Sequence, residues 1–142
     1  MSDKKRVFID MDDTLCHFSR RFAEKIKERP EIAYPQSQYG FFANLEPIQG
    51  AIEAYKTLEQ HYDVFILTAP SYINPLCYTE KRVWVEKHLG LETTPNLILC
   101  QRKEFIIGDY LIDDHFYPFK GEQLLFGSEQ YPDWASVLKY LL

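Results

Sequence analysis

Short apolar runs alternate along the chain with stretches that carry helical spacing or helix-capping signals. The apolar runs predict strands at 6–11, 63–67, 96–100, 110–113 and 123–126. The intervening patterns predict helices at 17–28, from 47 to about 58, at 79–89 and at 132–140. This alternation is typical of a parallel sheet with right-handed crossovers. We therefore expect an α/β fold in a single domain spanning residues 1–142.

Individual residues predict where the helices begin and end. Pro30 ends the first helix, because proline lacks the N–H that a helix interior requires. Pro47 suits the first position of the second helix, where that N–H is not needed. Thr79 can cap the third helix, and Gly90 stops it.

Residues 31–45 form a long stretch without a strand or helix pattern. The stretch contains Pro35 and Gly40 together with four aromatic residues, Tyr34, Tyr39, Phe41 and Phe42. It is too long for a turn and too apolar for a solvated linker. Loops of this length are usually functional lids or disordered, and the aromatic content favours a lid. We interpret 31–46 as a minimal cap.

Three carboxylates, Asp10, Asp12 and Asp13, follow the first predicted strand. A strand buried on both faces is a continuous apolar run, and ligands of open α/β sheets bind just past the carboxyl ends of such strands. Clustered like charges cost energy unless a cation relieves them. Mg²⁺ prefers oxygen ligands near phosphate. The cluster therefore predicts a magnesium site.

Polar groups also follow the later strands. Thr68 ends the second strand, Lys103 lies on the connector 101–108, and Asp113 and Asp114 end the fourth strand. Because the carboxyl ends of parallel strands meet at one edge, these groups should converge on the first cluster. They are the components of a phosphoryl-transfer site. Asp113 and Asp114, with Asp10 and the carbonyl of Asp12, can complete the coordination of Mg²⁺.

Each component has a predicted chemical role. Asp10 can attack phosphorus in line and form an aspartyl phosphate. Asp12 can protonate the departing oxygen and later deprotonate the attacking water, which requires a raised pKa. Thr68, with Ala69 beside it, can bind phosphate oxygens. Lys103 can stabilise the negative charge that develops on the phosphoryl group.

These motifs resemble those of the haloacid dehalogenase superfamily. Asp10-Met11-Asp12-Asp13-Thr14-Leu15 resembles its first motif, Thr68 its second, Lys103 its third and Leu111-Ile112-Asp113-Asp114 its fourth. Residues 42–47, residues 81–87 and the interval 103–114 are further similar to its 5′(3′)-deoxyribonucleotidase branch. The resemblance covers nearly the whole chain. It implies a three-layer Rossmann-like fold and a Mg²⁺-dependent phosphomonoesterase for (deoxy)nucleoside monophosphates.

The chain departs from that branch at two places. The segment between the first helix and Pro47 is much shorter than the helical cap of the mitochondrial and cytosolic members. Thr14-Leu15 is the general superfamily form, where those members carry Gly-Val. Both departures bear on base and sugar selectivity rather than on phosphatase chemistry.

Several candidate residues have rivals. Lys81 and Arg102 are alternatives to Lys103, which we prefer because the resemblance places it and because it precedes the metal-binding strand. Phe18 is the leading candidate for stacking on a nucleobase, since it follows Asp12 closely. The other candidates for that role are Phe41 and Phe42, and His115 could touch the site beside the acidic pair.

The composition limits the choice of partners and compartment. The chain has 16 Lys and Arg against 21 Asp and Glu, a net charge of −5, which argues against a nucleic acid polymer or an anionic membrane. A small anionic phosphoester remains compatible, because a bound metal reverses the local sign. Three scattered cysteines fit no disulfide framework. With no signal-like or membrane-length apolar segment, we expect a cytoplasmic monomer or homodimer.

Three alternatives to a nucleotidase remain open at this point. A phosphatase for another small phosphoester would use the same residues with a different substrate pocket. A receiver domain also combines clustered acids, a threonine and a lysine, but there the acidic pair ends the first strand and the accepting aspartate ends a later one. In this chain the acidic pair Asp113 and Asp114 comes last, which disfavours a receiver. A non-catalytic binding module is the third alternative.

Overall fold

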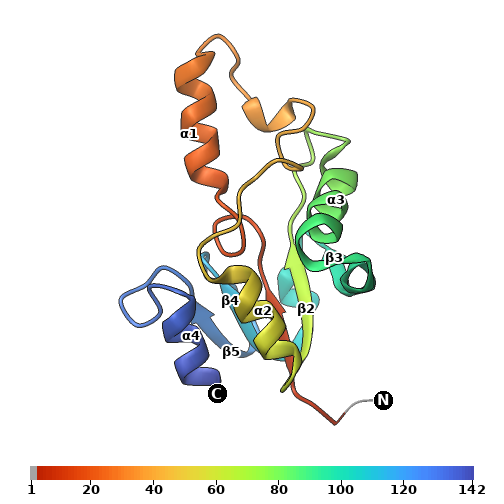
Figure 1. The fold of residues 1–142 in the computed structure, drawn as a ribbon, viewed down its shortest axis with the longest axis vertical. Helices are drawn as coiled ribbons and strands as arrows, with labels where there is room; N and C mark the ends of the chain where they lie inside the picture. Colours follow the sequence, from red (N-terminus) through yellow and green to blue (C-terminus); the bar gives the residue numbers. More distant parts are fainter. Residues whose placement is uncertain (1–2) are drawn as a thin grey trace.

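The computed structural model describes residues 3–142 and contains one five-stranded parallel sheet (Figure 1). The strand order is β3-β2-β1-β4-β5. The strands are β1 (Arg6–Ile9), β2 (Asp63–Thr68), β3 (Leu97–Leu99), β4 (Ile107–Asp113) and β5 (Lys120–Leu125). Ile9 pairs with Ile66 on one side and with Ile112 on the other, so β1 is central. The predicted α/β class is confirmed, and all carboxyl ends lie at one edge of the sheet.

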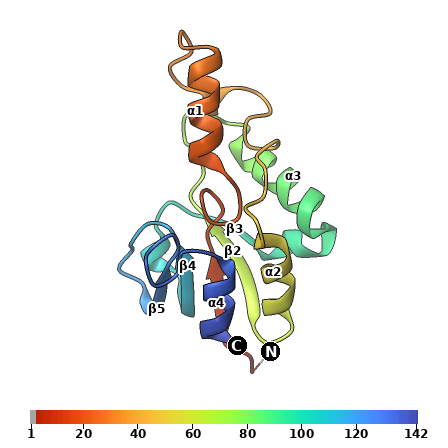
Figure 2. The same ribbon diagram turned by 60° about the vertical axis from the view of Figure 1, so that its left-hand side comes forward.

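Three of the four α-helices in residues 3–142, all but the first, cover the sheet and share one apolar core. The helices are α1 (Phe18–Glu28), α2 (Ala51–Glu59), α3 (Cys77–Leu89) and α4 (Trp134–Leu141), with 3-10 turns at Pro35–Ser37, Leu91–Asn96 and Lys103–Phe105. Tyr55 of α2, Trp84 of α3 and Trp134 of α4 are all buried in the core that includes Val7 and Ile9. Figure 2 shows α2 and α4 side by side in front of the sheet.

A second, smaller apolar cluster lies on the other side of the sheet. Phe8, Leu67 and Leu111 form its buried part, and residues of the connectors on either side of β4 pack against them. Phe8 fits there because the second residue of β4 is a glycine: a Cβ on Gly108 would come within 2.2 Å of the Phe8 ring. Within residues 3–142, the third layer that we expected is therefore made of connectors and not of helices.

Two of the predicted helix starts are wrong. The second helix begins at Ala51 and not at Pro47, because Gly50 adopts the left-handed region with a φ of 81° and interrupts the helix geometry. The third helix begins at Cys77 and not at the cap position predicted for Thr79. Asn74 forms the preceding turn, since its side-chain oxygen accepts from the N–H of Leu76.

Helix α1 and residues 31–46 project together beyond the carboxyl end of the sheet (Figures 1 and 2). The carboxylate of Glu80 on α3 fastens this projection. It accepts hydrogen bonds from the N–H groups of Gly40 at 2.8 Å and Phe42 at 3.0 Å. The projection is therefore tied to the body of the protein next to Lys81.

Among residues 3–142, no helix is both long enough and apolar enough to cross a membrane.

Candidate active site

A tight turn after β1 presents the first two aspartates. The carbonyl of Met11 accepts hydrogen bonds from the N–H groups of Thr14, Leu15 and Cys16, at 2.8–3.1 Å. Met11 and Leu15 are buried beneath this turn. Asp10 and Asp12 consequently line a cavity of about 240 Å³ at the carboxyl end of the sheet.

Asp13, the third acid of the cluster, anchors α1. Its backbone adopts a left-handed φ of 63°. Its carboxylate accepts a hydrogen bond of 2.8 Å from the N–H of Ser19 in the first turn of α1. A carboxylate is favourable there because the first N–H groups of a helix lack partners within the helix.

Lys103 joins Asp10 to Asp113. Its Nζ donates to Oδ1 of Asp10 at 2.8 Å and to Oδ2 of Asp113 at 2.7 Å. Burial would lower the pKa of Lys103, but the two carboxylates outweigh burial and raise it. Burial raises the pKa of Asp10, and Lys103 opposes that rise. The buried ammonium thus stays charged and holds two carboxylates in place.

Asp10, Asp113 and Asp114 form a carboxylate cluster that fits a metal ion. One oxygen from each lies within 4.8 Å of the others. Burial, followed by the neighbouring Asp10 and Asp113, raises the pKa of Asp114 to about 8. Crowded hard oxygen donors of this kind suit a divalent cation such as Mg²⁺, which would relieve their repulsion. The structure brings these three predicted ligands together.

The side chain of Asp12 points to a different partner, Lys81. The fully buried Nζ of Lys81 lies 3.1 Å from Oδ2 of Asp12 and also donates to Oγ1 of Thr68. It lies 3.4 Å from the carbonyl of Ala69. Burial raises the pKa of Asp12, while Lys81 lowers it. We predicted that Asp12 binds the metal through its backbone carbonyl oxygen, and this stays a prediction.

Two lysines therefore reach the site. The sequence predicts Lys81 only as an alternative to Lys103. A sequence signal for its role exists. Cys77, Lys81, Trp84 and Val85 are all buried on α3, so Lys81 interrupts an apolar helix face. Arg102, the other rival, is exposed and pairs with Glu104 at 2.6 Å.

His115 lies at the rim of the site. Its backbone N–H donates to Oδ1 of Asp113 at 3.0 Å, and its Nε2 lies 3.6 Å from Oδ2 of Asp114. The side chain itself is exposed. His115 therefore contacts the acidic pair mainly through its backbone.

An aromatic cavity of about 430 Å³ adjoins the catalytic one. Asp12, Phe18 and Phe42 line it from within. Tyr34 and Tyr72 also line it and are 61% and 89% exposed. Neither tyrosine is among the site residues predicted from the sequence, where Tyr34 counts only as part of the predicted lid. An exposed aromatic residue in a loop beside a catalytic strand end was the available signal.

Phe41 is placed differently from Phe18 and Phe42. It lines neither the catalytic nor the aromatic cavity. Its ring packs edge-on against Phe18, with centroids 5.6 Å apart. A direct contact between Phe41 and a base is still a prediction, and the structure gives Phe41 a position behind Phe18.

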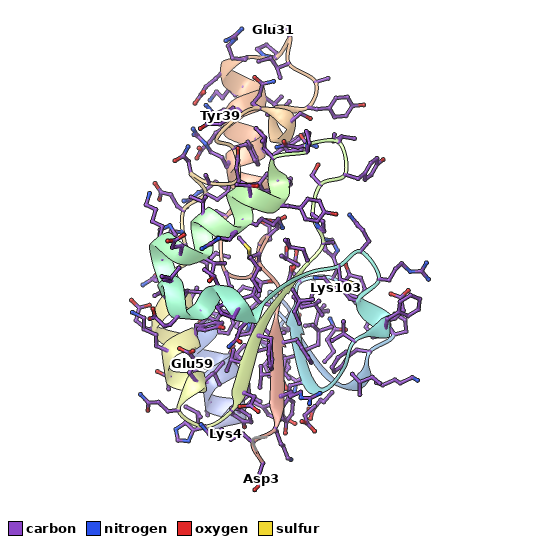
Figure 3. All side chains as sticks on the ribbon, turned by 90° about the vertical axis from the view of Figure 1, so that its right-hand side faces the viewer. Asp3, Lys4, Glu31, Tyr39, Glu59 and Lys103 are labelled. Carbon is purple, nitrogen blue, oxygen red and sulfur yellow. The ribbon has the colours of Figure 1, made fainter. Side chains whose placement is uncertain are left out.

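Figure 3 shows Lys103 and the tip of the projection at different heights along the molecule. Lys103 lies level with the ends of the strands, whereas Tyr39 and Glu31 lie far along the projection formed by α1 and residues 31–46. Lys103, and with it the predicted site, therefore lies at the base of this projection.

The parallel sheet, with Asp10, Lys103 and Asp113 together at its carboxyl edge, has the fold and the polar edge expected of the haloacid dehalogenase superfamily. The fold agrees with solved structures. A HAD family hydrolase from Deinococcus radiodurans R1 superposes with a TM-score of 0.54 at 14% identity, over 97% of this chain and 88% of that one. The class C acid phosphatase from Bacillus anthracis superposes with a TM-score of 0.53 at 19% identity, over 72% of this chain and 43% of that one.

Sequence comparison gives the family. Residues 29–131 match the family described as 5′ nucleotidase, deoxy (pyrimidine), cytosolic type C protein. A putative 5′(3′)-deoxyribonucleotidase of Vibrio phage KVP40 is 38% identical over 99% of this chain and 86% of its own. The human cytosolic-type 5′(3′)-deoxyribonucleotidase is 32% identical over 97% of this chain and 81% of its own. The chain belongs to the 5′(3′)-deoxyribonucleotidase family and is a phosphatase.

Family membership decides between the alternatives that the sequence left open. A receiver domain and a non-catalytic module are excluded, whereas the choice of phosphoester within phosphatase chemistry belongs to the proposal below.

Proposed function

We propose that the protein hydrolyses (deoxy)nucleoside monophosphates through a phosphorylated Asp10, with Mg²⁺ as cofactor. The observation that carries the proposal is the pairing of each catalytic aspartate with its own buried lysine. Asp10 lies 2.8 Å from Lys103, and Asp12 lies 3.1 Å from Lys81. Two neighbouring carboxylates with different partners suit different roles, one as nucleophile and one as acid and base.

In the first step, a carboxylate oxygen of Asp10 attacks phosphorus, and the bond between phosphorus and the ester oxygen breaks. Asp12 supplies the proton that the departing alkoxide requires. Its pKa is raised by burial, which keeps a protonated fraction available. Lys103 keeps Asp10 oriented for this attack. The products are a nucleoside and an aspartyl phosphate.

In the second step, Asp12 accepts a proton from water as the water attacks the aspartyl phosphate. Phosphate leaves and the carboxylate of Asp10 is restored. Thr68 ends β2 and Ala69 follows it directly, and both supply polar groups for the phosphate oxygens. Lys81 holds Thr68 and Asp12 together, so it positions both.

Asp10, Asp113 and Asp114, with the carbonyl of Asp12, would hold Mg²⁺. When bound, the ion neutralises charge on the phosphate oxygens and fixes the phosphoryl group for in-line attack.

The aromatic cavity is the proposed place for the nucleobase. Phe18 and Phe42 form its inner wall, and Tyr34 and Tyr72 stand at its mouth. Phe41 supports Phe18 from behind. A flat ring between these side chains would stack favourably. Residues 31–46 are the proposed minimal cap on a single domain that spans residues 1–142, and the proposed compartment is the cytoplasm.

The test is phosphate release with Mg²⁺ across 5′- and 3′-monophosphates of deoxy- and ribonucleosides, together with small sugar phosphates. Asp10→Asn should remove turnover, whereas Asp133→Asn should leave it intact, because asparagine caps α4 as well as aspartate does. Asp12→Asn should lower turnover by about 10²–10⁴-fold. Turnover of sugar phosphates alone would refute the nucleotidase, and full activity of Asp10→Asn would refute the nucleophile.

A further inference from the structure

A third cavity lies in the projection, between α1 and the segment that follows it. It has a volume of about 260 Å³. It is lined by residues of α1 and of the segment 29–44. None of them lines the catalytic cavity or the aromatic cavity. The cavity is therefore separate from the proposed phosphatase site.

Three cations line one wall of this cavity. Arg21 and Lys25 lie four residues apart on one face of α1, and Arg29 follows four residues later, directly after the last residue of the helix. Within the part of the chain that the structure describes, no carboxylate lines the cavity. The lining is thus strongly basic in a chain whose net charge is −5.

Each of these cations has an acidic neighbour outside the cavity. Arg21 lies 3.0 Å from Glu24, Lys25 lies 3.4 Å from Glu28, and Arg29 lies 2.5 Å from Glu31. All three pairs are at the surface, where such pairs contribute about 0–1 kcal/mol. A multiply charged anion in the cavity can compete with them, because it meets three cations together.

The opposite side of the cavity is apolar and aromatic. Phe41 is only 5% exposed, and Ile32 and Pro35 lie beside it. Tyr39 stands at the rim and is 89% exposed. Gln38 and Asn44 add amide groups. Such a lining suits a flat ring that carries hydrogen-bonding groups.

We propose that this cavity binds a nucleoside triphosphate. At the helical rise per residue, Arg21 and Arg29 are about 12 Å apart along the axis of α1, a length that suits a chain of phosphates better than a single phosphate. The aromatic side accommodates the base. The ligand differs from a monophosphate substrate in the number of its phosphates. The inference does not depend on the phosphatase proposal.

The experiment measures the affinity of thymidine triphosphate by calorimetry in the Asp10→Asn protein, without Mg²⁺. The cavity variant is Arg21→Gln/Lys25→Gln/Arg29→Gln. The control variant, Lys27→Gln/Lys56→Gln/Lys87→Gln, removes the same charge from exposed positions outside the cavity. Glutamine has a helix propensity close to those of arginine and lysine, so both variants should fold.

We expect the dissociation constant to rise at least tenfold in the cavity variant and less than twofold in the control. NMR titration should move the backbone amides of Gly40, Phe41 and Asn44. Thymidine should bind at least tenfold more weakly than its triphosphate, and so should inorganic tripolyphosphate.

Four results would overturn the inference. The first is that thymidine triphosphate does not bind the protein whose cavity is unchanged, and the second is that its dissociation constant rises equally in both variants. The third is that the amide shifts are confined to residues around Asp10 and Thr68. The fourth is that tripolyphosphate binds as tightly as thymidine triphosphate. Turnover of monophosphates by the cavity variant, measured separately in an otherwise wild-type chain, keeps the two proposals apart. Its presence or absence tests the phosphatase and leaves the binding result unaffected.

Discussion

The buried ammonium of Lys81 lies 3.1 Å from Oδ2 of Asp12, although 69 positions separate the two residues. The contact links α3 to the turn after β1. It also opposes the effect of burial on Asp12, since burial raises the pKa of this carboxyl and Lys81 lowers it. The protonation of the proposed acid and base therefore depends on a residue from another element.

Replacing Lys81 by methionine should shift the pH dependence of catalysis. Without the lysine the pKa of Asp12 rises further, so Asp12 keeps its proton to higher pH. The basic limb of the kcat/KM profile, which reports loss of that proton, should move to higher pH, and kcat should fall. Steady-state kinetics across pH measures both effects. Arg82→Met on the exposed side of α3 is the control, and an unmoved basic limb in Lys81→Met would contradict the tuning role.

The sequence could predict the sheet and most of the site because both depend on local patterns. Apolar runs predict the strands, and the order of the strands brings their polar ends together. Asp10, Asp113 and Asp114 meet as predicted for that reason, and Lys103 joins them from its connector.

Other features depend on turns and packing that helix-start signals and single residue types do not reveal. Pro47 and Thr79 carry ordinary helix-start signals, but the turns at Gly50 and Asn74 displaced both starts. The role of Lys81 follows from the packing of α3 against the catalytic turn. A lysine alone gives no sign of burial, and only its place within an apolar helix face does.

Lys103→Met should abolish turnover and weaken the metal-free fold. The substitution leaves Asp10 and Asp113 buried without their shared cation, and breaking such a buried pair typically costs about 3–5 kcal/mol. Urea unfolding in EDTA measures the loss, and phosphate release measures the activity. Arg102→Met, at the neighbouring exposed position, should change neither quantity measurably. Equal stability of the two variants would show that Lys103 does not hold the carboxylates.

Mg²⁺ should stabilise the protein more at high pH than at low pH. The pKa of Asp114 is about 8 in the metal-free fold, above its ordinary value of 3.8, so the folded chain binds more protons than the unfolded chain between these values. Stability without metal should therefore fall as pH rises through that window. Mg²⁺ binds the deprotonated carboxylates and so restores the stability that is lost at high pH.

Thermal unfolding with EDTA or with Mg²⁺, at about pH 5 and about pH 8.5, tests this linkage. The Mg²⁺-induced rise in Tm should be larger at the higher pH, and Asp114→Asn should flatten the difference. A rise in Tm that is the same at both pH values in the unmodified protein would speak against a titrating metal site.

Tyr72→Ala should weaken nucleotide binding without slowing the chemistry. The ring is 89% exposed at the mouth of the aromatic cavity, and a stacked aromatic pair contributes about 0.5–1.5 kcal/mol beyond the area that it buries. We therefore expect KM for a nucleoside monophosphate to rise about three- to tenfold with kcat unchanged, as for a loss of uniform binding. Deoxyribose 5-phosphate, which lacks the base, should react equally with both forms. Tyr78→Ala, an exposed tyrosine that lines neither cavity, is the matched control. If Tyr72→Ala raised KM equally for both substrates, Tyr72 would act on the phosphate end and the base would have to lie elsewhere.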